Sequence, residues 1–95
     1  MKFILKKLKN KKNRTAFFVC NLSFINFKGK IISVEGKING KISNLILGKQ
    51  GFGYDPIFIP KNEKITFGQM SKRKKINIDH RFIAFKKLKK KIKTL

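Results

Sequence analysis

The alternation of apolar and polar residues over residues 31–42 most limits what this chain can fold into. One alternating set is apolar or glycine and consists of Ile32, Val34, Gly36, Ile38, Gly40 and Ile42. The intervening set is polar and consists of Ser33, Glu35, Lys37, Asn39 and Lys41. Because successive side chains of a strand point to opposite faces, the pattern predicts a β-strand with one face on a core and one face in solvent. Glycines inside such a strand indicate a bulge, a bend or the close approach of another backbone.

The preceding segment supplies a partner for this strand. Residues 14–27 are rich in β-branched and aromatic side chains on both alternating faces, which predicts a strand covered on both sides. Lys28, Gly29 and Lys30 have the length and the glycine of a hairpin turn. We therefore expect the two strands to form an antiparallel hairpin.

Short elements are predicted before and after the hairpin. Residues 1–10 have the pattern of a short amphipathic helix, and residues 43–53 are typical of a loop, with glycines near their end. Residues 54–60 are an apolar run bracketed by Pro56 and Pro60, which predicts a further strand.

The last part of the chain predicts helices. Thr66 is placed to cap a short helix that extends to about Lys72, with its hydroxyl on backbone amides at the helix start. From about Asp79 to the end, apolar residues recur at helical spacing among lysines, which predicts a basic amphipathic helix. The order of elements predicts an α+β chain in which residues 1–95 form one partial domain.

The formal net charge of +21 raises the question of an anionic partner. Only Arg14, Arg73 and Arg81 of the 25 basic residues are arginines, although the planar guanidinium is the better ligand for phosphates and base edges. The charge is also spread along the whole chain. We therefore expect no dedicated nucleic-acid partner and no membrane partner, and a smaller anion such as a nucleoside triphosphate fits the same charge. A lysine-rich module that binds nucleic acid or an anionic membrane is the alternative.

Cysteine usage and the N-terminal residues bear on the compartment. The single Cys20 cannot form an intramolecular disulfide, and no cluster of Cys and His offers a zinc site. The apolar run of residues 3–5 ends at Lys6 and is too short for a signal peptide or a membrane span. We therefore expect a cytoplasmic protein.

Two short segments are candidates for ligand binding. The first is Gly51-Phe52-Gly53-Tyr54-Asp55-Pro56-Ile57-Phe58. The glycines on both sides of Phe52 allow a tight bend that leaves its ring projecting, and Pro56 favours an extended conformation for Asp55. This geometry would present Phe52 and Asp55 to a cleft. In the alternative, Phe52 and Tyr54 only fill the core of a turn.

The second segment contains Lys75 and then Asp79-His80-Arg81 at the start of the last helix. Helix N-termini attract anions, so these residues are candidates for contact with an anionic ligand. In the alternative, Asp79 is only an N-cap, and His80 and Arg81 form a solvated first turn.

Together the two segments resemble the inosine triphosphate pyrophosphatase family, enzymes that act on non-standard purine nucleoside triphosphates and are also called XTP/dITP diphosphatases. The resemblance is carried by Gly-Phe-Gly-Tyr-Asp-Pro-Ile-Phe, by Thr-Phe-x-x-Met from Thr66, and by Lys-x-x-x-x-His-Arg from Lys75. Residues 14–20 resemble a strand that enters the family's central sheet. The resemblance runs from about Arg14 to the last helix, which corresponds to the family's C-terminal half.

The resemblance implies a fold, a reaction and a set of binding residues. The fold would be part of an elongated α/β structure with a long mixed sheet, and the family forms homodimers. The reaction would be hydrolysis of inosine, deoxyinosine or xanthosine triphosphate to the monophosphate and pyrophosphate, with Mg²⁺. The residue matching Phe52 stacks on the base, those matching Asp55, His80 and Arg81 bind its edge, and the one matching Lys75 contacts the nucleotide. The implied substrate-binding set is Phe52, Gly53, Tyr54, Asp55, Lys75, His80 and Arg81.

The metal-binding and catalytic residues of the family have no counterpart in this sequence. The four acidic residues are Glu35, Asp55, Glu63 and Asp79, and no two of them form a close pair suited to a metal. We therefore expect no catalytic and no metal-binding residue here, no activity for the chain alone, and a complementary N-terminal half as a candidate partner. The alternative is a decayed remnant that has no stable fold.

Four positions depart from the family pattern. The family commonly has Ala-Glu where this chain has Gly68-Gln69, Asn where Ile76 stands and Ser where Asp79 stands. These changes leave the preference among inosine, deoxyinosine and xanthosine triphosphates open.

Overall fold

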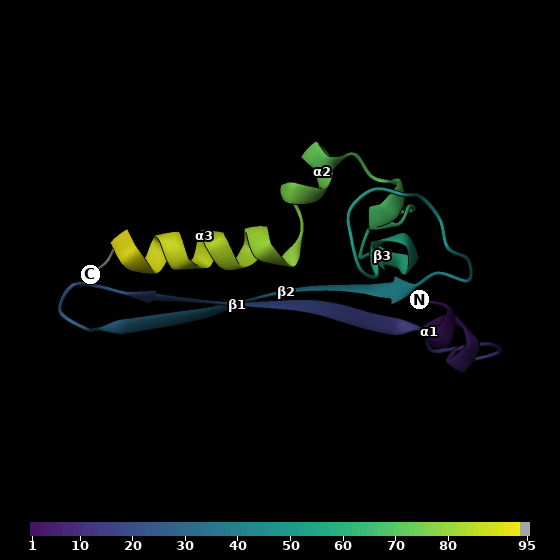
Figure 1. The fold of residues 1–95 in the computed structure, drawn as a ribbon, viewed down its shortest axis with the longest axis horizontal. Helices are drawn as coiled ribbons and strands as arrows, with labels where there is room; N and C mark the ends of the chain where they lie inside the picture. The colour runs from purple at the N-terminus through teal and green to yellow at the C-terminus, as the bar shows by residue number, and fades with distance from the viewer. Residues whose placement is uncertain (94–95) are drawn as a thin grey trace. The chain divides into compact units, whose positions relative to one another are not determined.

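A computed structural model describes residues 1–93 of the chain. Its sheet has the order β1-β2-β3, with β1 (Thr15–Ile25), β2 (Ile31–Ile42) and β3 (Phe58–Pro60). The helical segments are α1 (Lys2–Lys7), the 3-10 turns η1 (Asp55–Ile57) and η2 (Phe67–Gln69), α2 (Lys72–Ile76) and α3 (His80–Lys93) (Figure 1). The predicted α+β class is confirmed.

The chain divides into two compact units, which we describe one at a time. Unit 1 contains residues 1–17 and 39–75. Unit 2 contains residues 18–38 and the chain from Ile76 onward. The single partial domain over residues 1–95 stays a prediction.

In unit 2 the predicted hairpin turn is confirmed. The side-chain oxygen of Asn26 accepts hydrogen bonds from the backbone N–H groups of Lys28 and Lys30, both at 2.9 Å. Gly29 has φ +78°, a left-handed conformation that glycine adopts without steric cost. The alternation predicted for β2 is also confirmed, because its apolar positions are buried or half-buried and its polar positions are exposed.

The prediction that residues 14–27 form a strand covered on both sides is wrong. One alternating set of β1 is half-buried as far as Leu22, but the other is exposed, including Phe17 at 55%. Within unit 2, α3 runs along one face of the hairpin (Figure 1), where the ring of Phe18 lies 5.2 Å from that of His80. A single helix can cover only one face of a sheet. Apolar residues occur on both faces of β1, but only the face toward α3 is partly buried.

Gly36 of β2 sets the distance between the strand and α3 in unit 2. A Cβ atom at this position would collide with the backbone carbonyl of His80 and the backbone nitrogen of Ala84. Ala84 is fully buried on the helix side. Small residues on both elements therefore allow their backbones to approach closely, as the glycines in this strand predicted.

The apolar core of unit 1 forms around β3. The stacked rings of Phe58 and Phe67 are fully buried, with centroids 5.5 Å apart. β3 pairs antiparallel with β2, so that Ile42 lies opposite Phe58. The strand predicted for residues 54–60 is only partly correct, because its first half forms the turn η1 and only the last three residues pair with β2.

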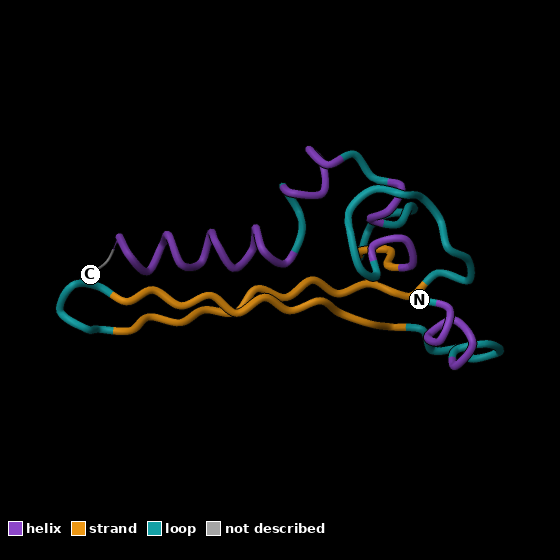
Figure 2. The backbone as a smooth tube through the Cα atoms, in the orientation of Figure 1, coloured by secondary structure: helices purple, strands orange, loops and turns teal. Residues whose placement is uncertain are grey.

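The helix predicted between Thr66 and Lys72 is also shorter than expected. Thr66 is the N-cap, as predicted, but η2 ends at Gln69 because Met70 is extended, with ψ 145°. A separate helix, α2, then begins at Lys72. The long loop before η1 curls around this part of unit 1 (Figure 2).

The helices at the two ends of the chain agree with their predictions. The short N-terminal amphipathic helix is α1, and all of its residues are at least partly exposed. The C-terminal helix α3 begins directly after Asp79 and reaches Lys93, and the last two residues of the predicted helix lie outside the described part. Among residues 1–93 no helix has the length and apolar character needed to cross a membrane.

Candidate functional site

The loop around Phe52 has the bend that its two glycines predicted. Gly51 has φ +74° and Gly53 has φ +62°, conformations that other residues rarely adopt. Between them Phe52 is 59% exposed, and Tyr54 is also exposed. The alternative in which these two rings only fill a core is therefore wrong for this structure.

Asp55 holds this loop from the inside. Its carboxylate is buried, and Oδ2 accepts a hydrogen bond of 2.9 Å from the backbone N–H of Phe52. The extended conformation predicted for Asp55 is not found, because Asp55 is the first residue of the 3-10 turn η1, which closes with a 3.0 Å bond from Ile57 N to Tyr54 O. Here the contacts of the carboxylate outweigh the local preference that a following proline imposes.

Lys75 of α2 reaches the same carboxylate oxygen. Its Nζ lies 2.5 Å from Asp55 Oδ2, and the two side chains are only 8% and 5% exposed. The ammonium also lies 4.5 Å from the centroid of the Phe52 ring and 5.7 Å from that of Phe67. These contacts are cation–π geometry, which is stronger where water is excluded. A buried ion pair therefore lies beneath an exposed aromatic ring.

Hydrogen bonds anchor the loop that carries Phe52 to η2. Thr66 accepts a bond from Gln69 N at 3.2 Å, and the Gln69 side chain accepts one from Thr66 N at 3.0 Å. This reciprocal pattern is a capping box. The Thr66 hydroxyl also donates to Leu47 O at 2.6 Å, and Gln50 N donates to Gly68 O at 2.8 Å. The loop is thus fixed on both sides of Gly48 before it reaches Phe52.

His80 and Arg81 lie in the first turn of α3, which belongs to unit 2. His80 is half-buried, and its ring makes an edge-to-face contact with Phe18. Arg81 is exposed. Asp79 is the N-cap, because its Oδ1 accepts a 2.9 Å bond from Phe82 N, so the capping alternative for this residue is confirmed. The same alternative placed His80 and Arg81 in a solvated first turn. This holds for the exposed Arg81 but not for the half-buried His80.

Unit 1 therefore brings Phe52, Asp55 and Lys75 into direct contact, with Gly53 and Tyr54 in the same loop. The other two predicted site residues belong to unit 2. The sequence interpretation missed Phe67 as a second ring beside Lys75. It also missed Gln69 as a capping partner, although the Thr-x-x-Gln spacing is itself a known signal of a capping box.

The described residues do not fit a magnesium site. No group of three or more His, Cys, Asp and Glu side chains occurs within residues 1–93. Asp55 and Glu63 each pair with a lysine instead, and Asp79 caps a helix. No step that requires a metal follows from these residues.

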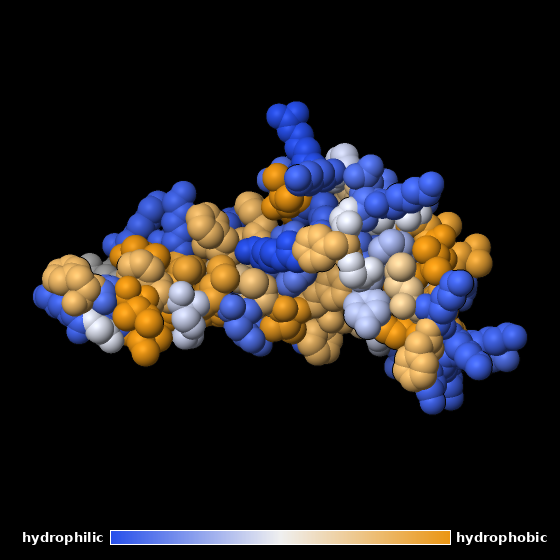
Figure 3. Space-filling model, in the orientation of Figure 1, coloured by the Kyte–Doolittle hydropathy of each residue, from blue (hydrophilic) through white to orange (hydrophobic). Residues whose placement is uncertain are grey.

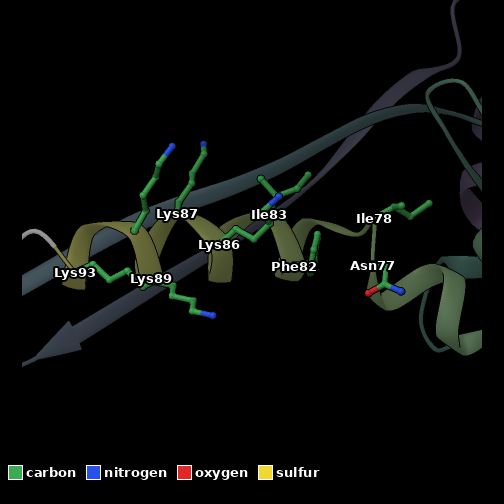
Figure 4. Close-up of a pocket in the computed structure, with 9 residues that line it drawn as sticks. Asn77, Ile78, Phe82, Ile83, Lys86, Lys87, Lys89 and Lys93 are labelled. Atoms are coloured by element: carbon green, nitrogen blue, oxygen red, sulfur yellow. The ribbon is translucent and has the colours of Figure 1, made fainter.

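A hollow runs along α3 in unit 2 (Figure 4). Its apolar part comprises Ile78, Phe82 and Ile83, and lysines of the helix surround it. The lining lysines are Lys86, Lys87, Lys89, Lys90 and Lys93. Hydrophilic and hydrophobic side chains are mixed over the face seen in Figure 3.

The fold is that of solved Ham1 proteins. The structure superimposes on "The structure of the Staphylococcus aureus Ham1 protein" with a TM-score of 0.90 and 34% identity, over 98% of this chain and 48% of that chain. A Ham1 protein from Coxiella burnetii matches with a TM-score of 0.86 and 28% identity, over 99% of this chain and 50% of that one.

The sequence comparison identifies the family. Residues 1–91 match the model of the Ham1 family, and the chain belongs to that family. A dITP/XTP pyrophosphatase of Borreliella burgdorferi (strain ZS7) is 47% identical over 92% of this chain and 44% of its own length. A dITP/XTP pyrophosphatase of Saccharolobus solfataricus is 48% identical over 92% of this chain and 45% of its own length. The chain thus spans about half the length of the relatives that it matches, and the predicted family is confirmed.

Proposed function

We propose that this chain supplies the purine-recognition part of a nucleoside triphosphate pyrophosphatase that acts on dITP, ITP and XTP. The observation that carries the proposal is the exposed ring of Phe52, held by its own backbone over the buried Asp55–Lys75 pair. The names of relatives, dITP/XTP pyrophosphatase, support the substrate class.

Phe52 would bind the base by stacking. An exposed ring on a fixed backbone offers one face to a planar ligand at a small entropic cost. Base–aromatic stacking contributes on the order of 1–3 kcal/mol and does not depend on which base is bound. Phe52 therefore supplies affinity, and Tyr54 and Gly53 shape the loop beside it.

Hydrogen bonds at the base edge would supply specificity. Hypoxanthine has a 6-keto acceptor and an N1–H donor, whereas adenine has the reverse arrangement at the same edge. Arg81 and His80 can donate to the keto oxygen, and the Asp55 carboxylate can accept from a protonated ring nitrogen. For Asp55, His80 and Arg81 this part of the proposal rests on the family resemblance and on their chemistry, since the Asp55 carboxylate is buried and its Oδ2 already accepts from Lys75 and from Phe52 N. If these donors become buried when the ligand binds, a site that leaves them unpaired with adenine can reject it by roughly 10⁴-fold.

Catalysis would require groups from outside the matched half. We propose that the magnesium ligands and the catalytic residues come from a polypeptide equivalent to the other half of the relatives, acting as the complementary partner. In this proposal the chain alone is inactive, the working enzyme is a homodimer as in the family, and the location is the cytoplasm.

The experiment that tests this is release of pyrophosphate from inosine triphosphate with Mg²⁺. The chain is assayed alone, and then with a separately expressed N-terminal half of a related pyrophosphatase. Activity only in the mixture is expected. Activity of the chain alone would contradict the assignment of catalysis to the partner, and no activity in the mixture with a folded chain would contradict the recognition role.

The hollow along α3 favours a second candidate function, binding of nucleic acid through phosphate groups. Its lysines surround an apolar floor, and Phe85 on the same helix is exposed. This function predicts DNA binding that weakens steeply with salt and does not change in Phe52→Leu. Salt-insensitive or undetectable binding would exclude it.

A further inference from the structure

We infer that Lys75 is a positioning residue for the Phe52 ring rather than a charge that binds the phosphates of a nucleotide. The inference rests on the proposed function, since it concerns how the same site holds its stacking surface. In this inference the buried Asp55–Lys75 pair holds the loop that carries Phe52, while the Phe52 ring stays exposed.

A single carboxylate oxygen connects Phe52, Asp55 and Lys75. Asp55 Oδ2 accepts both the 2.5 Å bond from Lys75 Nζ and the 2.9 Å bond from the Phe52 backbone N–H. Charge-assisted hydrogen bonds of this kind are shorter and stronger than neutral ones. The position of Phe52 N therefore depends on where Lys75 holds the carboxylate.

Lys75 also contacts the Phe52 ring directly. The Lys75 ammonium lies 4.5 Å from the Phe52 centroid, so it contacts the ring from the protein side. Phe67, which is fully buried, lies 5.7 Å from the same ammonium and limits its movement. Lys75 thus contacts the Phe52 backbone through Asp55 and the Phe52 ring directly.

Because Lys75 is buried, its charge interacts with Asp55 and the neighbouring rings and not with solvent. A lysine that serves phosphates is usually an extended, solvated point charge. Lys75 is instead almost fully buried, and its charge is already paired with the Asp55 carboxylate at hydrogen-bond distance. The neighbouring Lys74 is half-exposed, so α2 offers a matched lysine that lacks these contacts.

The test is a double-variant cycle with two ligands, neutral inosine and inosine triphosphate. Lys75→Met, Phe52→Leu and the double variant are titrated with each ligand, with Lys74→Met as the control. Lys75→Met is expected to weaken the binding of neutral inosine on the order of tenfold. The double variant is expected to bind inosine no more weakly than Phe52→Leu alone, and Lys74→Met is expected to bind it as the unchanged chain does. A loss confined to inosine triphosphate, or losses that add in the double variant, would overturn the inference.

A ligand-free measurement separates this inference from the proposed function. In proton NMR spectra the ε-methylene resonance of Lys75 is expected to carry a ring-current shift that becomes smaller in Phe52→Leu, where the Phe67 ring remains near the ammonium. The exposed Phe52 ring is not part of the core. The Phe52 amide is expected to exchange faster with solvent in Lys75→Met than in Lys74→Met. If inosine and adenosine bind equally well, the proposed function fails while these two results still support the positioning role. Unchanged resonances and unchanged exchange would refute the role whatever the ligand does.

Discussion

Two ion pairs of nearly equal length, made by adjacent lysines of α2, should contribute very differently to stability. Lys75 Nζ lies 2.5 Å from Asp55 Oδ2 in a buried pair. Lys74 Nζ lies 2.6 Å from Glu63 Oε1, but these side chains are 50% and 23% exposed. Distance alone would give the two pairs the same effect, whereas burial makes the loss of one partner much more costly for Asp55.

The magnitudes follow from solvation. Asp55→Asn keeps an oxygen that can accept from the Phe52 amide but leaves the buried Lys75 ammonium without a counter-charge, which costs about 3–5 kcal/mol. Glu63→Gln leaves Lys74 in contact with solvent and costs about 0–1 kcal/mol. Folded domains have a total stability on the order of 5–15 kcal/mol, so the first change is large and the second is small.

Urea unfolding followed by far-ultraviolet circular dichroism measures both changes by linear extrapolation. If Asp55→Asn unfolds the chain entirely, the double variant Asp55→Leu/Lys75→Met provides the second measurement. It replaces the pair with apolar side chains and should recover much of the lost stability. Equal losses of stability for Asp55→Asn and Glu63→Gln, or no recovery in the double variant, would show that burial does not distinguish the two ion pairs.

Three further substitutions test contacts within unit 1 or within unit 2, and urea unfolding measures the stability of each variant. Thr66→Ala removes a hydroxyl that both accepts and donates in a fully buried capping box and should cost about 1–2 kcal/mol, whereas Thr66→Ser should cost much less. Gly36→Ala should cost about 1–3 kcal/mol because the new methyl group meets the backbone of α3, and a loss under a few tenths would contradict the close approach. Asp79→Ala should cost about 1 kcal/mol through loss of the helix cap, and Asp79→Ser should restore most of it.

The parts of the fold that the sequence predicted correctly are those with a local signal. Alternation in residues 31–42, the glycine of the hairpin turn and the capping residues Thr66 and Asp79 all depend on neighbours within a few positions. The exposed ring of Phe52 belongs to the same group, because its flanking glycines determine the bend.

What the sequence did not predict depends on residues far apart in the chain. Asp55 and Lys75 are 20 positions apart, and no periodic pattern connects them, so their ion pair was not predicted. The same contact explains why Asp55 begins a 3-10 turn in spite of Pro56. Whether the second face of β1 is covered depends on how many layers lie against the sheet, and the composition of the strand does not contain that information.

Under the proposed function, this chain recognises a deaminated purine base through Phe52 and the groups that bind its edge. Calorimetric titration of the folded chain with inosine and with adenosine tests it most directly, because neither ligand carries a phosphate that could respond to the general positive charge. We expect that inosine binds, that adenosine binds at least about tenfold more weakly, and that Phe52→Leu weakens the binding of both. Equal affinity for the two nucleosides, or no binding of inosine by the folded chain, would contradict it.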